Sequence, residues 1–286
     1  MAERWLEAAA HAFVVHAPAR ENRALVRAQR RTQGKCIDSV ECLVEEVPVA
    51  LVFNGISHAV MLASPSDLED FALGFSLAEG ILASADELFD IEIEIEPGCR
   101  GIEVQMRIHG LRFAELKARR RTLVGRTGCG LCGIESLEAA ERRLMPVRRG
   151  APVGARAVLH AVDALYPHQE LHRATRAAHA AAWALPSGEI ACLREDVGRH
   201  NALDKLIGAL SRAGADLTGG FAVVTSRASV EMVQKAASAG IGVLAAVSAP
   251  TGMAVDQALH ANLTLIGNAR NGRLTCYSHP DGLFDD

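Results

Sequence analysis

The fold class is decided by the stretch FAVVTSRASVEMVQKAASAGIGVLAAVSAPTGMAVDQALHANLTLIGNAR, residues 221–270. It predicts apolar strands and helices in alternation: strands over 221–225, 241–247 and 263–266, and helices over 230–239 and 253–261. Gly240 stands where a glycine commonly ends a helix. Strands that alternate with helices of this length indicate βαβ units and a largely parallel sheet.

The residues before this stretch extend the same domain. Strands are predicted over 177–184 and 189–193, joined through Pro186-Ser187-Gly188, and a helix over 201–210 is expected to be capped by Asn201. We therefore expect residues 151–286 to form an α/β domain with a mixed or largely parallel sheet.

Residues 36–113 are predicted to form a smaller, N-terminal α+β domain. The pattern indicates a strand over 47–53, whose Pro48 favours a sheet edge, followed by a hairpin turn at Asn54-Gly55. A helix capped by Ser66 is expected next. The remaining strands are expected over 58–62, 91–95 and 102–108.

Two basic segments flank this small domain. Residues 1–35 carry most of their basic side chains in the second half, which favours a solvated tail or, alternatively, a docking strip for an acidic partner. Residues 114–150 form the second segment. From 115 to 150, nine basic and four acidic residues give a local charge of +5 in a chain of net charge -4.

Composition excludes several classes of protein. The chain has 286 residues, of which 49% are hydrophobic and 22% charged, the balance of a folded protein. Only 4% are aromatic, which argues against single-stranded nucleic acid as a partner. The apolar runs are too short to span a membrane. Seven cysteines, an odd number, and a poor secretory signal favour free thiols in the cytoplasm.

The motif GRTGCGLCG at 125–133 places Cys129 and Cys132 in a glycine-rich loop. Such a pair serves as a redox thiol, as half of a zinc site, or as a sulfur carrier. No second C-x-x-C exists, so we expect no metal site. Arg126 and the arginines at 119–121 would stabilise a thiolate, which favours a reactive cysteine over two idle ones.

Polar residues follow three of the predicted parallel strands, at 225–227, 248–251 and 267–273. Ligands of open α/β sheets gather at such strand ends. Arg270 and Arg273 can bind phosphate, so a phosphorylated ligand is expected, with ordinary polar loops as the alternative. The ionisable run at 195–201 indicates either a further site or a buried ion-pair network.

Together these residues resemble the FdhD family of formate dehydrogenase accessory proteins. The resemblance covers nearly the whole chain from about residue 37. Its specific motifs are GRTGCGLCG at 125–133, HAAAWALPSGE at 179–189, EDVGRHNALDK at 195–205, TSRASVEMVQKAASAG at 225–240 and SAPTGMAV at 248–255.

The resemblance implies a sulfurtransferase that acts through a cysteine persulfide. Such a protein takes sulfur from a cysteine desulfurase and delivers it to the molybdenum bis(molybdopterin guanine dinucleotide) cofactor needed by formate dehydrogenase. Cys129 would carry the persulfide and Cys132 would assist as a second thiol. The resemblance also implies a homodimer and a C-terminal domain like cytidine deaminase that lacks the catalytic zinc ligands.

The resemblance further implies a cofactor-binding stretch near the end of the chain. It consists of Asn268, Ala269, Arg270, Asn271, Gly272 and Arg273. The family usually has Gly-Phe where this chain has Gly267-Asn268, so an aromatic ring is missing beside the expected cofactor. A cofactor-binding chaperone with incidental cysteines and a thiol oxidoreductase are the rival functions.

Overall fold

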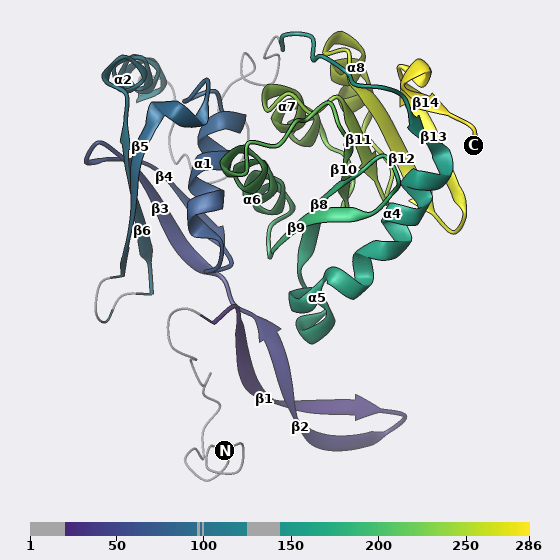
Figure 1. Ribbon diagram of the computed structural model, residues 1–286. Helices are drawn as coiled ribbons and strands as arrows, with labels where there is room; N and C mark the ends of the chain where they lie inside the picture. The colour runs from purple at the N-terminus through teal and green to yellow at the C-terminus, as the bar shows by residue number, and fades with distance from the viewer. Residues whose placement is uncertain (1–20, 96–97, 99, 125–143) are drawn as a thin grey trace.

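The computed structural model describes residues 21–95, 98, 100–124 and 144–286. Its body contains a four-stranded and a six-stranded sheet, with helices α1 (Leu68–Ala78) and α6 (Arg199–Arg212) packed against each other between them (Figure 1). A separate two-stranded hairpin extends from the body (Figure 1). The fold is thus a mixed α/β arrangement, the class that the sequence predicts, and we describe it by its two larger sheets.

The four-stranded sheet has the order β4-β3-β6-β5. Its strands are β3 (Val47–Phe53), β4 (Ile56–Ala63), β5 (Leu88–Ile95) and β6 (Ile102–Ile108). Helix α1 packs on one face, where alternate residues of the two central strands, β3 and β6, are buried with Phe71 and Phe75. The short helix η2 (Ala85–Glu87) precedes β5, and α2 (Gly110–Val124) follows β6.

The local turns of this unit confirm some predictions and correct others. Asn54 and Gly55 form the expected hairpin turn, with positive φ at both residues. Pro48 does not lie on an edge strand, because β3 is interior; its missing N–H is tolerated since pairing with β6 begins only at Val49. Ser66 does not cap α1, whose cap position is Asp67 with φ 51°.

The second half of the expected basic tail is a strand. Strand β1 (Arg23–Thr32) pairs along its full length with β2 (Lys35–Val44), and Gln33-Gly34 make the turn. The domain boundary expected at residue 35 therefore falls inside this hairpin, which we call the arm. The basic composition of residues 23–35 favours a solvated tail, but pairing between β1 and β2 orders this segment as a hairpin.

The six-stranded sheet has the order β13-β12-β11-β10-β8-β9, with β10, β11 and β12 parallel and the others antiparallel to their neighbours. Its strands are β8 (His179–Ala184), β9 (Ile190–Asp196), β10 (Phe221–Val224), β11 (Val243–Ala246), β12 (Thr264–Arg270) and β13 (Arg273–Ser278). A short parallel pair is formed by β7 (Val153–Gly154) and β14 (Leu283–Phe284). Strand β14 is close to the C-terminus and is preceded by η3 (Pro280–Gly282).

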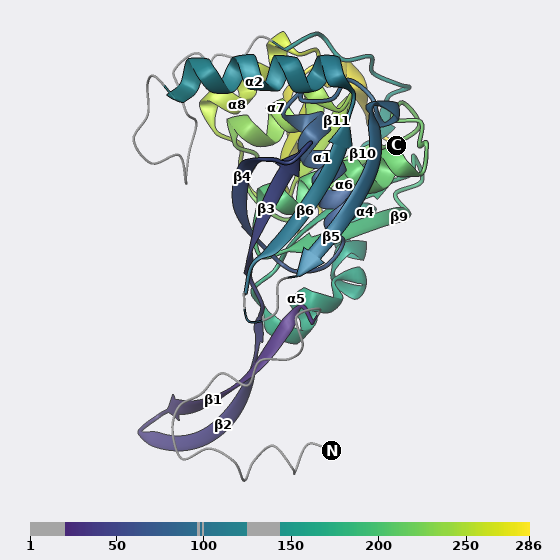
Figure 2. The same ribbon diagram turned by 90° about the vertical axis from the view of Figure 1, so that its left-hand side faces the viewer.

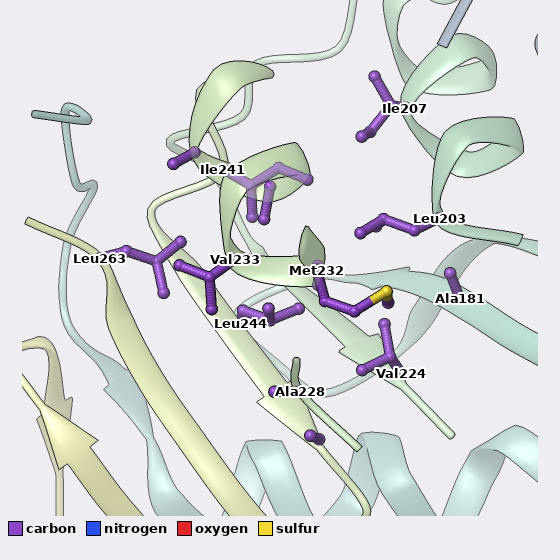
Figure 3. Packing of buried hydrophobic residues seen from close by; sticks show 14 of the residues in the cluster. Ala181, Leu203, Ile207, Val224, Ala228, Met232, Val233, Ile241, Leu244 and Leu263 are labelled. Atoms are coloured by element: carbon purple, nitrogen blue, oxygen red, sulfur yellow. The ribbon is translucent and has the colours of Figure 1, made fainter. Parts of the chain in front are cut away.

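Helices cover both faces of this sheet. On one face lie α6, α7 (Val230–Ser238) and α8 (Gly252–His260), while α4 (Ala155–His168) packs on the other and leads into α5 (Glu170–Thr175). Figure 3 shows Met232 and Val233 of α7 above Leu244 of β11. The apolar stretches therefore form a continuous core of three layers.

Two sequence expectations for this unit are wrong in detail. Asn201 lies inside the first turn of α6 rather than at its cap, which is Gly198. Strand β12 runs on to Arg270 and turns at Asn271-Gly272 into β13, a hairpin that the apolar pattern did not reveal.

The two units meet where helices α1 and α6 cross, and each helix has a glycine at the crossing point, Gly74 in α1 and Gly208 in α6. A Cβ on Gly74 would lie 1.7 Å from the carbonyl oxygen of Asp204, and one on Gly208 would lie 1.9 Å from that of Asp70. The two helix backbones are thus in direct contact. This close approach places buried charged residues of one unit against those of the other.

Candidate functional site

Three polar loops meet at one edge of the six-stranded sheet. The backbone joins them: Val247 N donates to Val224 O (3.0 Å), Thr251 N to Ala228 O (3.0 Å) and Asn268 N to Ser248 O (3.1 Å). The expected strand-end segments 225–227, 248–251 and 267–273 therefore form one surface at the carboxyl ends of β10, β11 and β12.

Helix N-termini converge on the same edge. Helices α7 and α8 begin directly after two of these loops, and Thr251 caps α8 through its hydroxyl, which accepts from Ala254 N. Helix α6 follows β9, whose last residue Asp196 pairs with His179 at this edge. Three aligned N-termini concentrate positive potential, which favours an anionic ligand.

The hairpin tip between β12 and β13 adds two arginines. Arg270 and Arg273 are directly opposite each other across the turn at Asn271-Gly272, and both are exposed. Both turn residues have positive φ, as a two-residue hairpin turn requires. Since like charges directly opposite each other are unfavourable, an anion bound between the guanidinium groups would stabilise this tip.

Two residues of the run 195–201, Asp196 and Asn201, belong to a buried network, and the others are partly exposed. Asp196 and Lys205 are fully buried, with 2.7 Å between the carboxylate Oδ2 and Nζ. Asp196 also accepts from the N–H groups of Ser64 and Gly198 and from the side-chain amide of Asn201. Because Ser64 belongs to the N-terminal unit, this network joins the two units.

A second buried cluster lies between α1, α6 and α7. Lys235 Nζ contacts Asp204 Oδ2 at 3.0 Å and Glu79 Oε1 at 2.7 Å. Burial raises the pKa of Asp204 to about 7, although Lys235 opposes this effect. Burial, helped by Arg199, lowers the pKa of His200 to about 4, and its Nε2 is 3.9 Å from Glu231.

A His200→Gln variant is expected to become more stable relative to wild type as pH falls from 7 to 4. The folded pKa of His200 lies below its ordinary value, so wild type loses this contribution to stability as pH falls through that window. Asp204, with its pKa raised, works in the opposite direction and remains in the variant. Urea unfolding at several pH values measures the difference. The exposed His168→Gln is the control, and identical pH profiles for His200→Gln and wild type would contradict this assignment.

The comparisons with known proteins agree on one family. The FdhD/NarQ family model matches residues 44–284. The chain belongs to the FdhD/NarQ family. Among curated relatives, "Sulfur carrier protein FdhD" of Cupriavidus necator is 54% identical over 254 residues, covering 89% of this chain and 88% of the relative. The protein of the same name from Bordetella petrii is 55% identical over 241 residues, covering 84% and 86%.

A solved structure shares the fold. Its title is "Crystal structure of a putative formate dehydrogenase accessory protein from Desulfotalea psychrophila", and it matches with a TM-score of 0.73 and 20% sequence identity. The similarity covers 92% of this chain and all of that one. The arrangement of strands and helices described above is therefore also found in a solved structure.

Asn268, where the resemblance implies a phenylalanine in other members of the FdhD/NarQ family, lies beside an aromatic ring. Asn268 has φ 52° and its side-chain amide donates to the hydroxyl of Tyr277 (2.8 Å). A Cβ on Gly267 would lie 3.1 Å from the Tyr277 ring. Sequence reasoning missed Tyr277 because it comes from β13, which only the hairpin pairing brings back to this site.

The other members of the expected stretch differ in what they present. Arg270, Asn271, Gly272 and Arg273 are exposed, whereas Ala269 is fully buried in the core under α4. Ala269 can therefore offer a ligand only its backbone atoms. The stretch is a charged hairpin tip with a buried base.

Cys129 and Cys132 of the family motif lie outside the described residues. The next described residue is Leu144, and nearby Val147 donates its N–H to Ala261 O and accepts from the side-chain amide of Asn262. Of the described cysteines, Cys192 is half-buried, and burial raises the pKa of its thiol. Such a thiol is a poor nucleophile near neutral pH.

Two features are absent from the described residues. No helix among them is long and apolar enough to cross a membrane. Likewise, no group of three or more His, Cys, Asp or Glu side chains in the described ranges is placed to hold a metal ion.

Proposed function

We propose that this protein is a sulfur carrier that receives sulfur from a cysteine desulfurase and passes it to the molybdenum bis(molybdopterin guanine dinucleotide) cofactor of formate dehydrogenase. The observation that carries the proposal is the 54% identity to a protein named as a sulfur carrier over 89% of this chain. The reactive motif GRTGCGLCG and the anion-binding sheet edge both suit this role.

The first half-reaction needs one nucleophilic thiolate. Cys129 Sγ attacks the outer sulfur of the persulfide on the desulfurase, the sulfur–sulfur bond of the donor breaks, and the donor cysteine leaves as a thiolate. Cys129 now carries the persulfide, and no net oxidation has occurred. Arginines near the motif, including Arg126, would favour the thiolate form.

The second half-reaction needs two electrons if sulfur leaves as sulfide. Cys132 can supply them by attacking Cys129 Sγ, which forms a Cys129–Cys132 disulfide and releases hydrosulfide. A dithiol reductant would then restore both thiols. In this scheme Cys132 assists release but is not needed for loading.

The sheet edge would hold the cofactor, which is the substrate of this transfer. Its guanosine phosphates would bind the Arg270 and Arg273 guanidinium groups and the nearby helix N-termini. Tyr277 offers a ring beside Asn268 for contact with a flat group. The six expected residues fit this role apart from the Ala269 side chain, which is buried.

Intact-mass measurement tests the proposal directly. After incubation with a cysteine desulfurase and cysteine, wild type is expected to gain one reductant-labile sulfur, and Cys129→Ala is expected to gain none. Cys132→Ala should still load. Absence of a sulfur adduct on wild type, with the desulfurase shown to be active, would overturn the proposal.

A further inference from the structure

One histidine near the sheet edge has a buried nitrogen without a partner. His200 is the second residue of α6, and its Nε2 is buried and makes no hydrogen bond to any described residue. The side chain as a whole is 32% exposed, so another edge of the imidazole ring reaches solvent. Buried polar atoms in native proteins are nearly always hydrogen-bonded, and an exception often belongs to a functional group. Packing alone therefore does not explain this histidine.

A carboxylate faces the buried nitrogen. Glu231 lies in the first turn of α7, and its Oε2 is 3.9 Å from His200 Nε2. The hydroxyl of Ser229 donates to the same Oε2 at 2.6 Å, which fixes the direction of the carboxylate. The distance of 3.9 Å is longer than a hydrogen bond, but contacts between catalytic groups are often loose before substrate binds. Ser229, Glu231 and His200 are thus connected in that order, and the exposed edge of the imidazole ends the series.

Charged groups from three helices surround His200. These helices, α1, α6 and α7, pack on one another behind the four-stranded sheet, which faces the viewer in Figure 2. Arg199 precedes His200 on α6, Glu231 and Lys235 come from α7, and Glu79 comes from the end of α1. Burial and Arg199 lower the pKa of His200 to about 4, so the ring is neutral at pH 7. A neutral imidazole can accept a proton from a substrate, and the carboxylate would stabilise the imidazolium that forms.

This histidine and its carboxylate lie at the edge of the six-stranded sheet that carries the candidate ligand site. Helix α6 begins directly after β9, and α7 begins in the loop that follows β10. The loop before α7 pairs with the loop before α8 through Ala228 and Pro250. The two helix N-termini therefore place His200 and Glu231 on the same surface as the three polar loops.

Release of the sulfur requires a proton to move. The release step belongs to the proposed function, on which this inference rests. In that step the Cys132 thiol must lose a proton to become a nucleophile, and the outer sulfur of the Cys129 persulfide must gain one to leave as hydrosulfide. A group that accepts the first proton and returns it to the leaving sulfur serves both needs. Such a group has to lie where the sulfur meets the cofactor, which is the sheet edge.

We propose that His200 is the acid–base residue of sulfur release and that Glu231 positions its ring. The imidazole accepts the thiol proton of Cys132 as Cys132 Sγ attacks Cys129 Sγ. The bond between Cys129 Sγ and the outer sulfur breaks, and its electron pair stays with the outer sulfur, which takes the proton from the imidazolium and leaves as hydrosulfide. The two cysteines are oxidised to a disulfide, the outer sulfur is reduced, and His200 is neutral again. Loading of Cys129 does not involve His200.

The test measures loading and release separately. Each protein is loaded by a cysteine desulfurase and cysteine and then separated from both. Samples are alkylated at intervals, and intact mass follows the loss of the sulfur adduct and the growth of the Cys129–Cys132 disulfide. His200→Ala is expected to load as wild type does and to form the disulfide about 10²–10⁴-fold more slowly, the usual contribution of a general acid–base group. Added imidazole is expected to restore part of the rate, because the exposed edge of His200 gives a small base access to the vacated position.

Three further variants complete the test. Glu231→Gln is expected to slow release less than His200→Ala, and Glu231→Asp, which keeps the charge, is expected to retain more of the rate than Glu231→Gln. The control is His279→Gln, since His279 is partly buried, is bonded to the carbonyl oxygen of Leu259 and lies beside Thr264 at the start of β12, the opposite end of the sheet. Circular dichroism checks that every variant is folded.

The outcomes separate this inference from the proposed function. Failure of wild type to load would count against the sulfur carrier itself. Normal loading of His200→Ala followed by release at the wild-type rate would overturn only the role of His200. Slow release that imidazole leaves unchanged would indicate a structural role and overturn it too, as would a loaded wild type that forms no disulfide or a His200→Ala variant that does not load.

Discussion

Cells that carry Cys129→Ala in place of the wild-type gene are expected to have formate dehydrogenase activity at background level. A thiolate is the group that accepts sulfur, and alanine offers no substitute. Removing the nucleophile of an enzyme costs about 10⁶-fold in kcat, so a cellular assay would reach its background first. Formate-dependent dye reduction in extracts of a deletion strain measures the effect.

This prediction separates the carrier from a cofactor-binding chaperone. A chaperone with incidental cysteines would keep supporting the dehydrogenase after the change. Cys192→Ala is the matched control, since burial raises the pKa of its thiol and no described contact places it at the sheet edge. Full activity with Cys129→Ala would favour the chaperone, whereas catalytic disulfide turnover without persulfide would favour a thiol oxidoreductase.

Lys205→Met is expected to lower the free energy of unfolding by about 3–5 kcal/mol. Lys205 is fully buried, and its ammonium group is 2.7 Å from the Asp196 carboxylate and 3.0 Å from the carbonyl oxygen of Ser64. Methionine has a similar length but leaves the carboxylate charged and without its cation. Urea unfolding followed by circular dichroism measures the loss.

A second variant shows whether the cost comes from the unpaired charge. Asp196→Asn combined with Lys205→Met removes both charges and should recover part of the lost stability. The exposed Arg156→Met is the control and should change stability by about 0.5 kcal/mol or less. A loss of less than 1 kcal/mol for Lys205→Met would show that this ion pair contributes little.

Some elements of the fold follow from short-range patterns alone. The strand over 47–53 and the helix over 230–239 agree with β3 and α7 to within a residue, because one face of each is buried and its period is visible in the sequence. The residue types Asn54 and Gly55 were also enough to predict the hairpin turn between β3 and β4. The position of Pro48, by contrast, depended on which strand pairs with β3, and β6 is distant in the sequence.

In the candidate site too, some features could be predicted from the sequence and others depended on long-range contacts. Arg270 and Arg273 were predicted from the sequence as phosphate ligands at a strand end, and the structure adds that the hairpin turn places them opposite each other. Tyr277 and the burial of Ala269 could not be predicted, since both depend on the β12–β13 register and on packing under α4. Likewise, only the folded chain showed that Asp196 of the run 195–201 is buried in a network with Lys205 and the distant Ser64.

The sequence by itself determined the α/β class, the family and the cysteine pair, because periodicity and motifs are properties of neighbouring residues. Tertiary structure alone decided that three loops and three helix N-termini share one edge, that charges from two units are buried together, and that residues 23–44 project as an arm. These features depend on contacts between residues far apart in the chain, and their energies exist only once the chain has folded.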